Sequence, residues 1–174
     1  MGQPGPAAGR AADPAAHPPD GSRLCLACGL CCRGALHTNV LLLPEEQGPA
    51  RELGLRPESY PDHLGFRLPC VHYKERRCAI YPARPAACRR YRCALLEACL
   101  EGSLPLEQAE RTARRAAGLF DRLEQRLPPG GVLWTLHSDQ GGEAVELPRQ
   151  VFRQWLFAAA DLEYFLRRHF LPRR

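Results

Sequence analysis

Cysteine is the residue type in this sequence that could do the most distinctive chemistry. The chain has 174 residues and nine cysteines, and eight of the nine fall between Cys25 and Cys93. Thiolates bind borderline and soft metal ions, attack electrophiles or join as disulfides. Such a density in one stretch is typical of a disulfide scaffold or a metal site.

The expected compartment decides between these two interpretations. Residues 1–22 are rich in Pro, Ala and Gly and contain no apolar run that could form a signal-peptide core. No segment of the chain reaches the roughly 18 uninterrupted apolar residues of a membrane span. We therefore expect a soluble cytoplasmic protein without membrane attachment, in which clustered cysteines remain reduced and serve as metal ligands or catalytic thiols.

The first cysteine group reads Cys25-Leu-Ala-Cys28-Gly-Leu-Cys31-Cys32. Two cysteines separated by two residues can direct both sulfurs to one metal ion at about 2.3 Å, and Gly29 would relieve backbone crowding after the second ligand. The run is similar to the opening of a bacterial ferredoxin ligand motif. Adjacent side chains usually diverge, so Cys31 and Cys32 suggest either two neighbouring metal sites or one ligand and one reserve thiol.

The second group contains Cys70, Cys78, Cys88 and Cys93. Four cysteines in each group allow two four-sulfur sites, or one polynuclear centre with supporting ligands, and the spacing leaves both open. Four arginines near the second group could stabilise thiolate charge by hydrogen bonding, namely Arg84, Arg89, Arg90 and Arg92.

Other candidate ligands fit this pattern less well. Cys99 is expected to be a small core residue on a helix, and His72, two residues after Cys70, is expected to be exposed rather than a substitute for a thiolate. The other histidines have no ligand spacing, among them His37, His63, His137 and His169. No Ser-His-Asp set, phosphate-binding glycine loop or carboxylate pair is visible, so the sequence favours a protein that is not an enzyme.

The elements expected along the chain divide it into three parts. Residues 1–22 are interpreted as a disordered leader, 23–102 as the cysteine-cluster region and 103–174 as a helical support region. Within the cluster region we expect a buried strand in 35–43 and a short helix over 45–53 ended by Gly54. Prolines interrupt residues 56–93, so we expect that metal ligation, rather than a strand ladder, organises this stretch.

The support region is expected to be mostly helical. Apolar residues recur at steps of three and four, which predicts an amphipathic helix carrying Leu106, Ala109, Ala113, Ala116, Phe120, Leu123 and Leu127. A second long helix is expected over 148–171, and a short hairpin over 130–148. The predicted fold class is α+β and mostly helical, with irregular cysteine-rich metal-binding loops and a short strand backed by two long C-terminal helices.

The distribution of charge bears on possible partners. The chain carries a net charge of +5, of which residues 23–93 contribute +6 and residues 94–174 contribute nothing. A four-thiolate site on a divalent ion carries about −2, so bound metal would neutralise much of this excess locally. There is also no basic stripe interleaved with aromatic residues, which argues against a nucleic-acid partner.

The combined motifs resemble the YkgJ-like CxxCxxCC cysteine-cluster family of zinc- or iron-chelating proteins, a resemblance covering residues 24–93. A CxxCGxCC run is followed about forty residues later by PC, then by CxIYxxRPxxCR and a further Cys. The resemblance implies a bacterial protein that binds zinc or iron through Cys25, Cys28, Cys31, Cys32, Cys70, Cys78, Cys88 and Cys93. Similar clusters occur in flagellin lysine N-methylases. This analogy alone suggests that the protein acts alongside an enzyme that transfers methyl groups.

Three functions remain open at this point. The preferred one is a non-enzymatic metal-binding protein. The first alternative is an iron-sulfur protein or subunit that acts in electron transfer or methyl-transfer chemistry with a partner enzyme, and the second is an interaction module built on structural zinc. A metal site with an open coordination position would favour a catalytic role, and a site fully closed by protein ligands would favour a structural one. The number of thiolates does not distinguish zinc from iron, because four-sulfur tetrahedral sites suit both metals.

Overall fold

Helices make up most of this computed structural model, which describes residues 19–126 and 148–172. The helices are α1 (Pro19–Cys28), α2 (Gln47–Glu52), α3 (Ala86–Arg90), α4 (Ala94–Leu100), α5 (Leu106–Glu124) and α6 (Arg149–His169), with two 3-10 turns, η1 (Pro44–Glu46) and η2 (Tyr81–Ala83). The strands are β1 (Asn39–Leu41), β2 (Pro57–Ser59), β3 (Leu64–Arg67), β4 (Tyr73–Lys74) and β5 (Arg77–Cys78). The predicted class, α+β and mostly helical, is confirmed.

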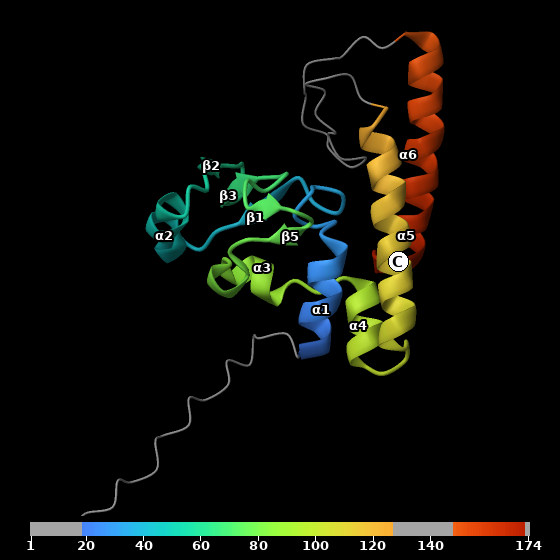
Figure 1. Cartoon of the computed structure of the whole chain (residues 1–174). Coiled ribbons are helices and arrows are strands. Elements are labelled where there is room, and N and C mark those ends of the chain that lie inside the picture. The colour runs from blue at the N-terminus through green and yellow to red at the C-terminus, as the bar shows by residue number, and fades with distance from the viewer. Residues whose placement is uncertain (1–18, 127–147, 173–174) are drawn as a thin grey trace, which may run out of the picture.

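The two long helices lie side by side and run in opposite directions (Figure 1). The predicted stripe of α5 is buried at Ala109, Ala113, Ala116, Phe120 and Leu123, each at most 1% exposed. Leu106, at the start of the stripe, is half-buried, and Leu127 lies outside the described residues. Alanines in the middle of the stripe allow close approach of the neighbouring helices, and the larger side chains fill the remaining space. The two helices were correctly predicted because a 3.6-residue period is visible over many turns.

The cysteine region and the long helices share one core. Helix α1 packs on α5, and α4 contacts both of these helices. The large side chains of this helical core include Leu30, Leu96, Phe120, Leu162 and Phe170, all at most 1% exposed. The first cysteine motif is therefore built on the helical part of the molecule.

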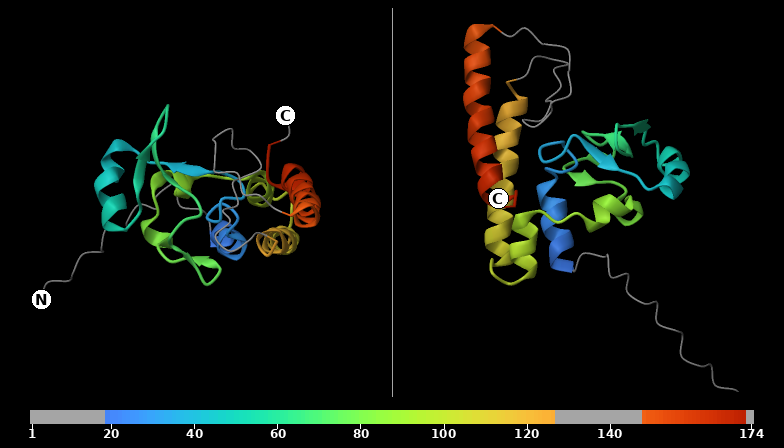
Figure 2. Two further views of the ribbon diagram at one scale, coloured as in Figure 1. Left: turned by 90° about the horizontal axis from the view of Figure 1, so that it is seen from above. Right: turned by 180° about the vertical axis from the view of Figure 1, so that it is seen from behind.

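A small sheet forms the opposite side of the molecule (Figure 2). Strand β3 lies between β1 and β2 and is antiparallel to both, with Val40 opposite Phe66 and Glu58 opposite Gly65. A second core, the sheet core, lies beneath it and consists of Leu42, Ala50, Leu55, Phe66 and Leu68.

The expectation that residues 56–93 contain no strand ladder is wrong. Besides β2 and β3, this stretch contains the hairpin β4–β5, in which Glu75 and Arg76 adopt positive φ angles of 48° and 63°. These strands are two to four residues long, too short to show a two-residue period in the sequence. Their pairing is set by contacts between distant residues rather than by local pattern.

The remaining elements agree only in part with their predicted bounds. The helix expected over 45–53 is present as η1 and α2, and Gly54 follows it at φ +76°. The strand expected in 35–43 is limited to β1, and α1 begins at Pro19, inside the stretch expected to be disordered. The predicted hairpin over 130–148 lies almost wholly outside the described residues. Among the described helices, none is long and apolar enough to cross a membrane.

Candidate metal centre

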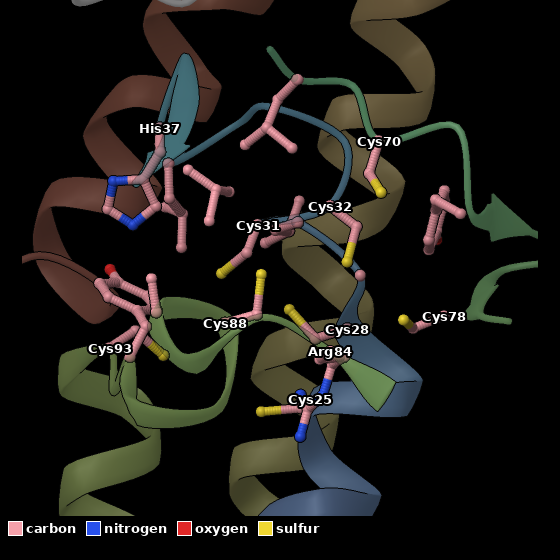
Figure 3. A pocket seen from close by; sticks show the side chains of 18 of the residues that line it. Cys25, Cys28, Cys31, Cys32, His37, Cys70, Cys78, Arg84, Cys88 and Cys93 are labelled. Atoms are coloured by element: carbon pink, nitrogen blue, oxygen red, sulfur yellow. The ribbon is translucent and has the colours of Figure 1, made fainter. Parts of the chain in front are cut away.

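All eight cysteines of the two predicted groups line one cavity, of about 260 Å³ (Figure 3). They come from α1, the turn after it, the loop before β4, strand β5, helix α3 and the residue preceding α4. Most of the wall is apolar, and it includes Leu36, Phe66, Ile80 and Phe170. Segments that are far apart in sequence thus bring their thiols to a common space.

Helix α1 positions the first two thiols. Cys25 and Cys28 are three residues apart on a helix, so their side chains lie on the same face. The helix ends at Gly29, whose φ of +65° is a left-handed conformation favourable to glycine. A Cβ atom there would lie 2.4 Å from the Tyr73 ring, so Gly29 also allows the β4 segment to approach the motif.

A tight turn presents the next two thiols. Leu30 is fully buried in the helical core, and its carbonyl accepts a hydrogen bond from the Ala35 amide at 3.0 Å. The carbonyl of Cys32 accepts a hydrogen bond from the Cys70 amide at 2.7 Å. This bond ties the CxxCGxCC run to the loop that carries the second cysteine group.

Backbone amides surround several of the sulfurs. Cys93 directly precedes α4, and its sulfur accepts hydrogen bonds from the amides of Leu96 and Leu95. Burial raises the pKa of Cys93, and these hydrogen bonds lower it by a smaller amount. The Cys70 sulfur, after the cis Leu68–Pro69 bond, accepts from two amides in the same way. Such donors stabilise the thiolate form that binds metal.

Burial keeps most of these thiols protonated in the metal-free protein. It raises the pKa of Cys25 to about 11 and of Cys28 and Cys88 to about 12, and raises the pKa of Cys31 well above its usual value. Any metal ion bound here would therefore displace protons and provide the charge that stabilises the thiolates.

One pair of thiols shares a hydrogen bond. The bond between Cys32 and Cys78 raises the pKa of Cys32 and lowers that of Cys78. The proton is therefore retained on Cys32 and the negative charge is favoured on Cys78, which is the less buried of the two predicted ligands.

Arg84 supplies positive charge in the cavity wall (Figure 3). Its guanidinium lies 3.5 Å from the centre of the Tyr81 ring, and its Nε donates to the Tyr81 carbonyl at 2.9 Å. Its charge lowers the pKa of Cys25, Cys78 and Cys88, against the larger effect of burial at Cys25 and Cys88.

The other three arginines do not share this position. Arg89 donates to the carbonyl of Arg84 and so supports that side chain indirectly. Arg90 and Arg92 are exposed. Of the four arginines that the sequence suggested as thiolate partners, Arg84 is the one that lines the cavity.

The residues that fitted the cysteine pattern less well are also placed by the structure. Cys99 lies on α4 and packs against the helical core, as predicted. His72, expected to be exposed, is instead half-buried, because its Nε2 lies 2.5 Å from the Leu53 carbonyl oxygen and the ring is held against this backbone.

His37 is a residue of this cavity that the spacing argument missed. Its ring meets Tyr91 edge-on at 4.4 Å and lines the cavity wall. Its Nε2 is buried and has no hydrogen-bond partner within the part of the chain described. His37 is brought here by the turn before β1 rather than by proximity to a ligand motif, so no local signal could have identified it.

The donor set fits zinc or iron. Both metals bind thiolates in tetrahedral sites, and eight thiols surround this cavity. In residues 19–126 and 148–172, no three His, Cys, Asp or Glu side chains are arranged as ligands around a common point. Metal binding would therefore require the thiols to come closer together around the ion.

A helix-backed cavity walled by eight thiols is the donor arrangement of a thiolate metal-binding domain. The sequence model of the CxxCxxCC family, described as a "putative zinc- or iron-chelating domain", matches residues 24–116. The match covers more than half of the chain, which belongs to this family. It extends from the cysteine motifs into helix α5. No curated protein and no solved structure gives a significant match.

Proposed function

We propose that this protein chelates zinc or iron through the thiolates of Cys25, Cys28, Cys31, Cys32, Cys70, Cys78, Cys88 and Cys93, and that it does so without catalysing a reaction. The observation that carries this proposal is that all eight thiols line one cavity, whereas Cys99 packs against the helical core outside the cavity lining. The family to which the chain belongs supports the choice of metals.

The chain's own groups would hold the ion in three ways. The thiols supply the ligands, the amides of Leu95 and Leu96 stabilise Cys93, and Arg84 offsets thiolate charge. The apolar remainder of the wall excludes water and strengthens these interactions. Zinc would supply a closed structural cross-link here, whereas iron would supply one-electron chemistry.

A reducing compartment such as the cytoplasm is part of the proposal. Thiols must remain reduced to bind metal, and oxidation would remove the ligands.

Metal analysis of cysteine variants tests the proposal. The protein is purified without oxygen and its zinc and iron are quantified by elemental analysis. We expect bound metal in the natural protein and a loss of metal in Cys28→Ser and Cys88→Ser. Cys99→Ser is the matched control and should keep full metal content. Equal metal content in all three variants would overturn the ligand assignment.

An iron-sulfur cluster is a second candidate, favoured by the meeting of all eight thiols at a single cavity of about 260 Å³. It would support electron transfer, or methyl-transfer chemistry beside a partner enzyme. A brown protein with sulfide released by acid would establish this candidate. A colourless protein carrying zinc would exclude it and leave a structural or chelating role.

A further inference from the structure

We propose that the eight thiols form two separate four-thiolate sites rather than one polynuclear centre, an inference that rests on the proposed function. The first, the helical site, comprises Cys25, Cys28, Cys31 and Cys93. The second, the sheet site, comprises Cys32, Cys70, Cys78 and Cys88.

Packing separates the two sets. All four cysteines of the helical site contact the helical core formed by α1, α4, α5 and α6. Cys70 and Cys88 instead contact the sheet core. The cavity thus lies between two independent hydrophobic cores, and each core carries thiols of its own.

Electrostatic effects on three thiols of the helical site come mainly from other thiols of the same site. After burial, the thiols that act most on Cys31 are Cys28, Cys93 and Cys25, in that order. Cys93 and Cys25 likewise act on Cys28, and Cys93 acts on Cys25. Because such effects fall with distance, they agree with the grouping that the packing against the two cores gives.

The thiols of the sheet site also act on one another. Cys32 is hydrogen-bonded to Cys78, and its pKa is also raised by the adjacent Cys31 and, to a smaller extent, by Cys70. Cys70 is affected by Cys78, and Cys88 by Cys70 and Cys78. Electrostatic effects between thiols of different sites are found for two pairs, Cys31 with Cys88 and Cys31 with Cys32.

The adjacent pair Cys31 and Cys32 is the point of division. Cys31 packs on the helical core. Cys32 instead makes two hydrogen bonds to the sheet side of the cavity: its thiol is hydrogen-bonded to Cys78, and its carbonyl accepts a hydrogen bond from the Cys70 amide. Figure 3 shows Cys32 beside Cys70, and Cys31 on the side of the cavity toward His37. Divergent neighbouring side chains serve two ions more readily than one.

Arg84 is placed to act on both sites. Its charge reaches Cys25 of the helical site and Cys78 and Cys88 of the sheet site. Two four-thiolate divalent sites would each carry about −2, so a shared cation between them reduces their mutual repulsion.

Cadmium-113 NMR tests the division on the intact chain. Cadmium replaces zinc at thiolate sites, and correlation of each cadmium signal with cysteine Hβ protons identifies the ligands of each ion. We expect two cadmium resonances, one correlated with Cys25, Cys28, Cys31 and Cys93 and the other with the four cysteines of the sheet site. One resonance, or one ion correlated with both Cys31 and Cys32, would overturn the division while leaving metal binding by these thiols intact.

Two matched variants provide a second readout. Cys28→Ser should lose about half of the bound zinc and the helical-site resonance, and Cys78→Ser should lose about half and the sheet-site resonance. Loss of all metal from either variant, with the helical circular dichroism retained, would indicate a single centre and refute the division. Absence of metal from the natural protein would instead refute the proposed function.

Discussion

The guanidinium of Arg33 lies 2.6 Å from the Asp121 carboxylate, which joins the residue directly after the Cys31–Cys32 pair to helix α5. Arg33 also contacts Glu124 at 2.5 Å and covers the Phe120 ring at 4.3 Å from its centre. Its side chain is only 7% exposed. This cluster fixes the end of the first cysteine motif on the long helices.

Arg33→Met should therefore destabilise the zinc-loaded protein by about 2 kcal/mol, because a buried charge-assisted network is lost while apolar volume is kept. Urea unfolding measures the change. Arg111→Met is the control, since Arg111 lies on α5, the helix that Arg33 contacts, in an exposed pair with Glu107, and its substitution should cost less than about 0.5 kcal/mol. Equal effects of the two substitutions would contradict this role for Arg33.

Phe120→Ala should destabilise the protein by about 3–5 kcal/mol, because Phe120 is 1% exposed and fills the centre of the helical core. Phe157→Ala is the matched control, since Phe157 is 67% exposed on α6 and should have little effect. An Asp at position 120 would be a poorer probe, because Arg33 lies over this ring and could pair with the new carboxylate. A small effect of Phe120→Ala on thermal unfolding would show that the helices are held together in another way.

Removal of metal should loosen the sheet side of the molecule and spare the helices. Among the residues that the structure describes, the sheet core has five buried residues, whereas the helical core has fifteen. In amide hydrogen exchange, a chelator should abolish protection in β1–β5 and in residues 29–34, while α5 stays protected. Unchanged protection in the sheet after chelation would mean that its order does not depend on ligation.

Zinc binding should release protons, and the apparent affinity should rise with pH. The pKa values of Cys25 and Cys28, at about 11 and 12, are raised by burial above neutrality, so both thiols carry protons at pH 7 without metal. Each of these two thiols then loses one proton on coordination, and a rise in pH favours the bound state. Calorimetry in buffers of different ionisation enthalpy counts the protons. Zinc binding without proton release would contradict coordination by these thiols.

The amphipathic stripe of α5 and the spaced cysteines were predictable because each depends on local sequence. Ala109 to Leu123 repeat with the period of a helix, and CxxC spacing limits how far two sulfurs can be separated. That the CxxC of Cys25 and Cys28 lies on a helix was not predictable, since the same spacing also occurs in chelating loops.

The rest of the site depends on contacts that no local pattern encodes. Residues 64–67 form the central strand because Phe66 fills the sheet core and both β1 and β2 pair with it. His37 likewise reaches the cavity through tertiary packing, with its ring against Tyr91. Tertiary packing, not spacing, determines which thiol faces which neighbour.

X-ray absorption at the metal edge of the anaerobically purified protein tests the central claim most directly. The fine structure reports the element and distance of the atoms bound to the metal. We predict a shell of about four sulfur atoms at about 2.3 Å for zinc, as expected for thiolate ligation. A shell of nitrogen or oxygen atoms near 2.0 Å, without sulfur, would contradict chelation by the cysteine cluster.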